Sequence, residues 1–481
     1  MRSIYCFIII SILLGLSPLT SANIRMPRIF SDNMVLQRDA GIRIWGWADQ
    51  DERVTVILGD QKKVTRTGRD GRWEVSLLPM KAGGPFQMSV QGKNSLEFSN
   101  ILIGDVWVCS GQSNMAWSVS RSANPDHEIL HADHPEIRLF TVPRTIDTSP
   151  ANDLTGGEWF VCSPESISSF SAVAYYFGRH INIESGVPVG LINSSWGGTV
   201  AETWISRPTI ATIDDFREII AQTGQPAGGQ RTDGPNSFPS LLYNGMINPI
   251  ISFSIKGVIW YQGESNAGRA YQYREIFPAL IGDWRKQWGQ DEMPFLFVQL
   301  ANFKAPVTDP AESDWAELRE AQAMALALPS TGMAVTIDIG EADDIHPLNK
   351  QDVGKRLALS ALKVAYDRDI VHSGPVYNSM SIEGTRIRLD FTSFGSGLTA
   401  KDRYGYLKGF AIAGEDGKFQ WAQAFIEGDQ VVVYSNRVKN PVAVRYAWAN
   451  NPDDANLYNM EGLPASPFRT DDWPGITLGV K

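Results

Sequence analysis

The chain has few of the features that define several common classes of protein. Among 481 residues there are three cysteines, and Cys6 lies near the start, so Cys109 and Cys162 are too few for a disulfide framework. After residue 22 no apolar run approaches the ~20 residues of a membrane-spanning helix. The net charge is −10, so the basic surface that binds nucleic acid is also lacking. We expect two free thiols, no membrane anchor and no nucleic-acid partner.

The first 22 residues have the three parts of a secretory signal peptide. Met1-Arg2 is followed by an apolar stretch from Ile4 to Leu16, which is shorter than a spanning helix, and then by the small residues Thr20-Ser21-Ala22. We therefore expect cleavage near Ala22 and an exported protein, periplasmic or extracellular.

The remaining chain divides into three regions by its pattern of apolar residues. Residues 23–100 contain short alternating runs such as Arg53-Val54-Thr55-Val56-Ile57, which predict an N-terminal β-sandwich domain. Residues 101–370 alternate strand-like runs with helical patterns, which is typical of a three-layer α/β/α domain with a parallel sheet. Residues 371–481 return to a β pattern and predict a C-terminal β domain. Whether part of it packs against the N-terminal β domain is left open by the sequence.

Within residues 101–370 the α/β pattern is regular enough to place its elements. Five apolar runs are expected to form strands, at residues 101–109, 187–193, 255–261, 294–300 and 332–338. Helical patterns lie between or after them, at residues 169–184, 271–288, 315–328 and 350–366. Each strand can therefore return to the sheet by a crossover.

Residues that could take part in catalysis or ligand binding follow four of these five runs. Ligands of an open parallel sheet bind beyond the carboxyl ends of its strands, so these residues are expected to meet. Taken alone, Ser113 would be read more simply as a cap of the next helix. The residues in question are Ser113, the pair Gly197-Gly198, Asn266 and the segment from Asp343 to His346.

These residues can fill every role that acyl transfer needs. Ser113 supplies the nucleophilic oxygen, His346 is the base, and Asp343 can fold back to accept the other ring proton. A backbone N–H at Gly197 or Gly198 can approach the oxyanion because no Cβ stands in the way. The Ser113 N–H and the amide of Asn266 would complete the oxyanion hole.

Four ordered segments carry a resemblance to a known group of enzymes. Gly111-Gln112-Ser113-Asn114-Met115, the segment 196–199, the segment 260–266 and the turn from Asp343 to His346 resemble the blocks of the SGNH hydrolases. More narrowly, these segments and the flank 30–37 are similar to the sialate O-acetylesterases and related carbohydrate acetylesterases. The resemblance implies a metal-independent serine esterase, without a cofactor, that removes acetyl groups from sugars.

The resemblance leaves the sugar open. A 9-O-acetylated sialic acid is the first expectation, and an acetylated plant polysaccharide, xylan or xyloglucan, is the alternative. Trp196 is expected to contact the substrate because flat aromatic faces suit the apolar faces of sugars. Gln112 and Glu264, within the matched segments, are further candidates for substrate contact.

Other interpretations of single residues compete with this one. The segment from His127 to His131 matches the zinc-protease pattern HExxH, with His134 as a third possible ligand, although only a short helix is expected there. Ser265 is a second candidate nucleophile, and Asp344 competes with Asp343 as the acid. A non-catalytic carbohydrate-binding protein would share the β regions and the aromatic residues but needs no Ser-His-Asp set.

Overall fold

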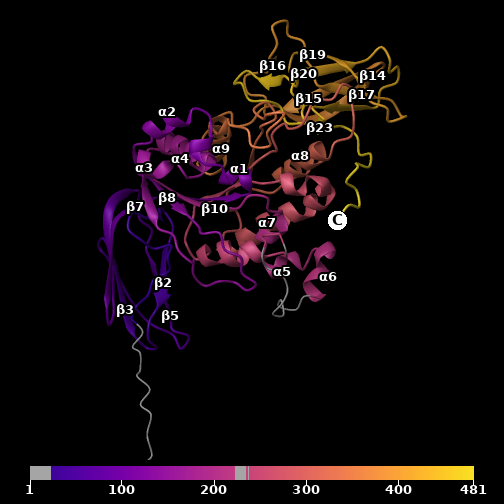
Figure 1. Ribbon diagram of the computed structural model, residues 1–481. Coiled ribbons are helices and arrows are strands. Elements are labelled where there is room, and N and C mark those ends of the chain that lie inside the picture. Colours follow the sequence, from indigo (N-terminus) through magenta and orange to yellow (C-terminus); the bar gives the residue numbers. More distant parts are fainter. Residues whose placement is uncertain (1–22, 223–233, 237) are drawn as a thin grey trace, which may run out of the picture.

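The structure is a computed structural model that describes residues 23–222, 234–236 and 238–481 (Figure 1). The expected signal peptide, residues 1–22, lies outside the described residues. In the described part of the chain, no helix is both long and apolar enough to span a membrane. Cys109 and Cys162 are buried free thiols, as expected.

A mostly parallel sheet forms the centre of the molecule. Its strand order is β13-β12-β11-β7-β10-β8-β9, and every neighbouring pair is parallel except β8 with β9. All five predicted strands are present, whereas β8 and β9 were not predicted because β8 begins with polar residues and β9 is short. The strands are β7 (Ser95–Gly111), β8 (His134–Thr141), β9 (Trp159–Cys162), β10 (Val189–Ser195), β11 (Gly257–Tyr261), β12 (Phe295–Val298) and β13 (Thr331–Ala334).

Helices cover both faces of this sheet, which makes the domain the expected three-layer α/β/α fold. Successive residues of a strand point to opposite faces, so Trp107 and Cys109 pack with α4 and α9, whereas Val106 and Val108 belong to the core that includes α7. The four predicted helices are present. They are α4 (Ala172–Ser185), α7 (Ala270–Trp288), α8 (Asp314–Met324) and α9 (Lys350–Val364).

Shorter helical segments occupy the connections between these elements. The α-helical ones are α1 (Ser113–Ala116), α2 (Pro125–Leu130), α3 (Pro164–Ile167), α5 (Arg207–Ile210) and α6 (Asp214–Gln222). The others are η1 (Val119–Arg121), η2 (Ala201–Trp204), η3 (Tyr243–Ile247), η4 (Asn248–Ile250), η5 (Glu264–Arg269) and η6 (Ala325–Ala327).

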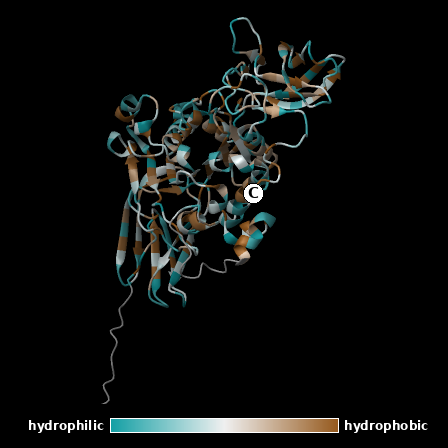
Figure 2. Cartoon of the chain, turned by 45° about the vertical axis from the view of Figure 1, so that its right-hand side comes forward, coloured by the Kyte–Doolittle hydropathy of each residue, from teal (hydrophilic) through white to brown (hydrophobic). Residues whose placement is uncertain are grey.

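The N-terminal β region is joined to the central sheet through one long strand. In this region β2 pairs with β5, while β4, β3, β6 and the first half of β7 form an antiparallel sheet that β1 extends. The expected boundary at residues 100 and 101 therefore falls inside β7. Polar and apolar residues alternate along these strands (Figure 2). Their bounds are β1 (Val35–Gln37), β2 (Ile42–Trp47), β3 (Arg53–Leu58), β4 (Gln61–Arg66), β5 (Arg72–Leu77) and β6 (Gly83–Gln91).

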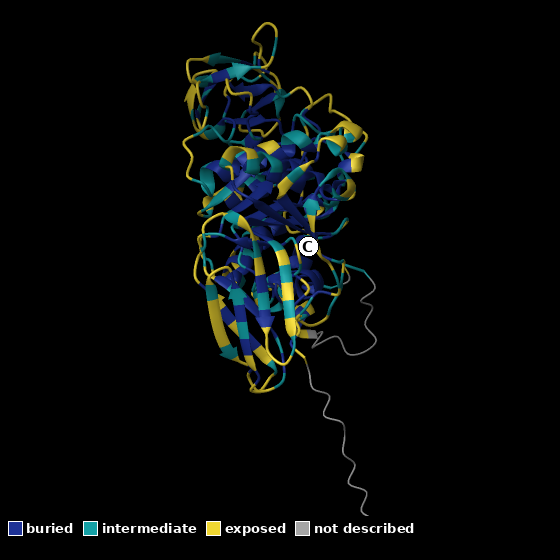
Figure 3. Ribbon diagram, turned by 90° about the vertical axis from the view of Figure 1, so that its left-hand side faces the viewer, coloured by how far each residue is buried: buried dark blue, intermediate teal, exposed yellow. Residues whose placement is uncertain are grey.

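The C-terminal β region lies at the opposite end of the α/β domain from the N-terminal one (Figures 1 and 3). It contains antiparallel sheets of order β14-β15-β20-β19 and β18-β17-β21-β23, and the pair β16-β22. The two β regions therefore do not form one unit. The strands are β14 (Val376–Glu383), β15 (Arg386–Thr392), β16 (Leu398–Ala400), β17 (Phe410–Ala413), β18 (Gln420–Trp421), β19 (Gln423–Glu427), β20 (Gln430–Tyr434), β21 (Ala443–Tyr446), β22 (Leu457–Asn459) and β23 (Phe468–Arg469).

Candidate active site

Ser113 begins helix α1 directly after the carboxyl end of β7. Gly111 lies beside both Ser195 of β10 and Tyr261 of β11 in the sheet register. Its φ is 137°, and a Cβ at this position would lie 2.1 Å from the Tyr261 carbonyl oxygen. Only glycine fits this turn, which delivers the serine to the strand-end edge of the sheet.

Gly197 adjoins Ser113 from the loop after β10. A Cβ built at Gly197 would lie 3.2 Å from the Ser113 Cβ, and the preceding Trp196 N–H donates to the Gly111 carbonyl at 3.1 Å. Gly198 is exposed, has a φ of 74°, and accepts a hydrogen bond from the Asn236 amide. Of the two glycines, the geometry therefore favours Gly197 as the neighbour of the nucleophile.

The carboxylate beside His346 belongs to Asp344. The Asp344 Oδ1 lies 3.5 Å from the His346 Nδ1, and it also accepts the His346 backbone N–H at 2.8 Å. Asp343, which the sequence argument preferred, has an exposed side chain. The reason is local: an aspartate bonds the backbone N–H two residues ahead in a tight turn, which brings its carboxylate to the ring. These contacts favour Asp344, the alternative acid, over the expected Asp343.

Trp117 supports the His346 ring from the far end of α1. The two rings are stacked, with centroids 4.5 Å apart and planes inclined by 12°. The Arg121 guanidinium lies 3.5 Å from the centroid of Trp117. Burial lowers the pKa of His346; Asp344 opposes this shift, and Lys350 and Arg121 reinforce it. Burial therefore favours the neutral imidazole, the form in which a histidine can accept a proton.

A buried polar chain connects three of the four motif segments. The Asn114 Nδ2 donates to Glu264 Oε1 at 2.6 Å and to the Ile345 carbonyl at 3.0 Å, while Lys350 Nζ donates to Asn114 Oδ1 at 2.5 Å. Burial lowers the pKa of Lys350 to about 7, against the opposing effect of Glu264. Asn114, the residue after Ser113, is thereby bonded to Ile345, the residue before His346.

Glu264 and Gln112 face protein groups. Burial raises the pKa of Glu264, and its Oε2 is buried with no hydrogen-bond partner among the described residues. The Gln112 Oε1 accepts the backbone N–H groups of Gly263 and Ser265, both at 3.3 Å. Both side chains therefore hold the β7 and β11 strand ends together.

Asn266 is buried and its amide orientation is set by three hydrogen bonds. The Oδ1 accepts from the Ala201 backbone N–H at 3.0 Å and from Gln262 Nε2 at 2.6 Å, and the Nδ2 donates to Glu202 Oε2 at 3.0 Å. Glu202 in turn pairs with Arg269 at 2.7 Å. The amide nitrogen therefore cannot exchange places with the oxygen without losing these bonds.

The tryptophans near the motifs divide into two groups. Trp204 and Trp260 are fully buried in the core. Trp196 is half-buried, and the exposed Arg144 lies 5.9 Å from its ring centroid. Trp196 and Trp117 therefore remain as the aromatic side chains beside the candidate site. Sequence reasoning missed the part played by Trp117, and it missed Lys350 because the start of a predicted helix is an ordinary position for a lysine.

The HExxH residues are engaged in contacts of their own. Glu128 accepts from Arg179 at 2.6 Å, and the His131 Nδ1 lies 2.8 Å from the His127 carbonyl oxygen. Helix α2, which carries the motif, contains no buried residue. Across the described ranges no group of three or more His, Cys, Asp or Glu side chains is arranged to hold a metal. The geometry therefore gives the zinc interpretation no support.

Comparisons with known proteins agree with the motifs. The family described as "Carbohydrate esterase, sialic acid-specific acetylesterase" matches residues 103–363. The sialate O-acetylesterase of Mus musculus is 31% identical, covering 96% of this chain and 97% of its own, and that of Homo sapiens is 32% identical, covering 95% of each. The crystal structure of XAC1771, a carbohydrate acetylesterase from Xanthomonas citri, is 43% identical with a TM-score of 0.87, covering 94% of this chain and all of that one.

These likenesses extend along almost the whole chain, so they include both β regions as well as the α/β domain. They favour an enzyme over a non-catalytic carbohydrate-binding protein. The chain belongs to the sialic acid-specific acetylesterase family of carbohydrate esterases and is a carboxylic ester hydrolase.

Proposed function

We propose that Ser113 is the nucleophile of an O-acetylesterase. Its Oγ attacks the acetyl carbonyl carbon while His346 takes the hydroxyl proton, and the imidazolium then gives this proton to the departing sugar oxygen. Water next attacks the acetyl-enzyme, again with His346 as base, and releases acetate and free serine. Asp344 stabilises the imidazolium. The observation that carries this proposal is the glycine-dependent turn that brings Ser113 against Gly197, in a chain of this family.

The oxyanion hole is proposed to contain three donors. These are the backbone N–H groups of Ser113 and Gly197 and the Nδ2 of Asn266, whose carbonyl oxygen is turned away by two hydrogen bonds. An amide nitrogen carries two protons, and Glu202 accepts one of them. The second is assigned to the oxyanion.

For the substrate we propose a sialic acid that carries an O-acetyl group, with the 9-O-acetyl ester as first choice. The curated relatives are named for sialate esters. In addition, Arg121 and Arg144 are exposed beside the aromatic side chains of the site, and an arginine pairs well with a sugar carboxylate. We further propose that residues 1–22 direct export and that the enzyme works in the periplasm or outside the cell.

An acetylated neutral polysaccharide is the second candidate, because the Xanthomonas citri relative is named only as a carbohydrate acetylesterase. Acetate release should be measured on 9-O-acetylated sialic acid, acetylated xylan and acetylated xyloglucan. Preference for the sialate ester, lost in an Arg121→Ala and Arg144→Ala double variant, supports the first proposal. Equal or better turnover of xylan or xyloglucan assigns the second.

The serine mechanism has its own test. Ser113→Ala should abolish hydrolysis of p-nitrophenyl acetate without changing the thermal unfolding midpoint, and Ser265→Ala should leave it intact. Turnover at the wild-type rate by folded Ser113→Ala protein would refute the assignment.

A further inference from the structure

A cavity lies where the C-terminal β region meets the loop that follows β12. The cavity has a volume of about 400 Å³, which is within the range of about 300–1,000 Å³ typical of ligand sites. A neighbouring cavity of about 290 Å³ shares Gly409, Trp421 and Trp448 with it. These two adjoining cavities are together called the Trp421 groove below.

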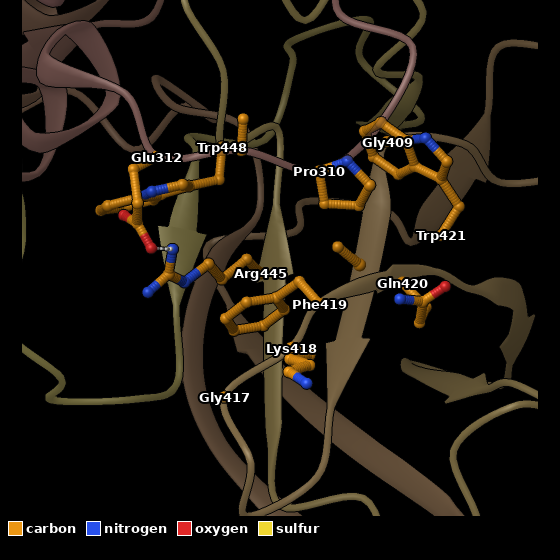
Figure 4. A pocket seen from close by; sticks show the side chains of 12 residues that line it. Pro310, Glu312, Gly409, Gly417, Lys418, Phe419, Gln420, Trp421, Arg445 and Trp448 are labelled. Atoms are coloured by element: carbon orange, nitrogen blue, oxygen red, sulfur yellow. Dashed lines mark hydrogen bonds and ion pairs between the residues drawn. The ribbon is translucent and has the colours of Figure 1, made fainter.

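Trp421 is the side chain that stands out in this groove. It is 44% exposed, and its Nε1 donates to the Thr308 carbonyl oxygen at 2.8 Å. The hydrogen bond fixes the ring, so little conformational entropy is lost when a ligand stacks on it. Figure 4 shows Trp421 on one side of the pocket and Trp448 on the other, with Phe419 between them. Flat, pre-positioned aromatic walls of this kind suit the apolar face of a pyranose ring.

The guanidinium of Arg445, which lines the groove, is paired with carboxylates of the protein. Arg445 pairs with Glu312 at 2.8 Å and with Asp471 at 2.9 Å, and its guanidinium lies 4.3 Å from the centroid of Phe419. Its charge is therefore already compensated by protein carboxylates. Lys418 and Gln420 add hydrogen-bonding groups to the lining. An uncharged ligand with both polar and apolar faces fits this lining better than an anion does.

One wall of the groove is built by a loop that leaves the sheet at the same edge as the segments carrying Ser113 and His346. Strands β12 and β13 are parallel neighbours; the loop after β12 builds one wall of the groove, and the segment after β13 carries His346. The Lys304 N–H donates to the Ala342 carbonyl oxygen at 3.0 Å, two residues before Asp344. Also, the Phe303 N–H donates to the Asn450 carbonyl oxygen at 3.2 Å. The loop thus links the active-site edge to the C-terminal β region.

We propose that the Trp421 groove is a non-catalytic site that binds a neutral sugar unit of the glycan whose acetyl group the enzyme removes. Trp421 stacks on the pyranose ring, and Lys418 and Gln420 bond to its hydroxyl groups. The link to glycan deacetylation rests on the proposed function, whereas binding of sugar in the groove does not. The groove adds affinity for the long substrate and leaves the chemistry of the ester unchanged.

Binding should be measured by isothermal titration calorimetry with xylohexaose and lactose, in the Ser113→Ala background. We expect saturable binding of a neutral oligosaccharide that Trp421→Ala weakens by about tenfold, the loss that removal of a central aromatic anchor commonly causes. Trp421→Phe keeps an aromatic face and should retain most of the affinity. Tyr404→Ala removes an aromatic side chain that is 72% exposed outside the groove, and it serves as the control.

The active enzyme supplies the second readout. Trp421→Ala should leave kcat/KM for p-nitrophenyl acetate unchanged and raise the KM for an acetylated polysaccharide. Absence of neutral-sugar binding or equal binding by folded Trp421→Ala protein would overturn the proposal. So would binding of 3′-sialyllactose that is tighter than that of lactose and that Trp421→Ala weakens, because binding at the Ser113 site does not depend on Trp421. Failure of the wild-type enzyme to hydrolyse p-nitrophenyl acetate would instead overturn the proposed esterase mechanism and leave the binding result standing.

Discussion

Asp344→Asn tests which carboxylate assists His346. The change removes the negative charge, while the amide oxygen can still accept the His346 backbone N–H that the carboxylate accepts at 2.8 Å. At the 3.5 Å that separates Asp344 from the ring, a charge pair contributes about 1–5 kcal/mol for an effective dielectric constant of about 80 to 20. The Asp344 side chain is 47% exposed, so screening by solvent reduces the interaction energy of the charge pair to about 1–2 kcal/mol.

That energy corresponds to a loss of about 5- to 30-fold in kcat/KM for p-nitrophenyl acetate. Asp344 raises the pKa of His346, so its removal lowers that pKa, and the acidic limb of the pH profile should move to lower pH. Asp343→Asn, the matched control, should change kcat/KM by less than about twofold because its side chain is exposed. A larger loss in Asp343→Asn than in Asp344→Asn would refute the reasoning.

Three further variants probe the groups around Ser113. Lys350→Met removes a charge that lowers the pKa of His346, so the acidic limb of the pH profile should move to higher pH, opposite to Asp344→Asn; an unshifted limb would contradict the coupling. Gly197→Ala places a methyl group 3.2 Å from the Ser113 Cβ and should cost about 100-fold in kcat. Gly198→Ala meets open space, so it should cost stability through its positive φ but little activity, as calorimetry and kinetics would show. Asn266→Ala should lower kcat by about 10²–10³, and a loss confined to KM would exclude the oxyanion role.

The sequence predicted five of the seven strands on the main path of the sheet, and the four motif segments, because their signals are local. Strands β7 and β11 are continuous apolar runs whose side chains, such as Val108 and Ile259, pack on opposite faces of the sheet. A glycine, Gly111 or Gly263, lies at or just after the end of each strand. Since strand ends of a parallel sheet converge, the meeting of Ser113 with Gly197 follows from topology. The choice between Asp343 and Asp344 did not follow, because both lie within one turn of His346 and loop dihedrals decide which carboxylate faces the ring.

Periodic patterns in the sequence could not predict contacts between residues that lie far apart in the chain. Lys350 and Asn114 are 236 positions apart, and a lysine at the first residue of a predicted helix is ordinarily solvated. Likewise, the stacking of Trp117 on His346 needs the relative placement of α1 and the segment after β13. These pairings depend on packing between elements, which single-residue patterns do not encode.

The buried chain of Lys350, Asn114 and Glu264 is better explained by positioning than by stability. Burial lowers the pKa of Lys350 to about 7 and raises that of Glu264, so both side chains are held where their charged forms are disfavoured. A protein in which apolar residues of similar volume replace such a buried pair is often at least as stable. Apolar side chains could not hold Asn114 in place by hydrogen bonds. Its amide donates to the Ile345 carbonyl oxygen at 3.0 Å. These three side chains therefore fix the His346 segment relative to Ser113, and the proposed acyl transfer depends on that geometry.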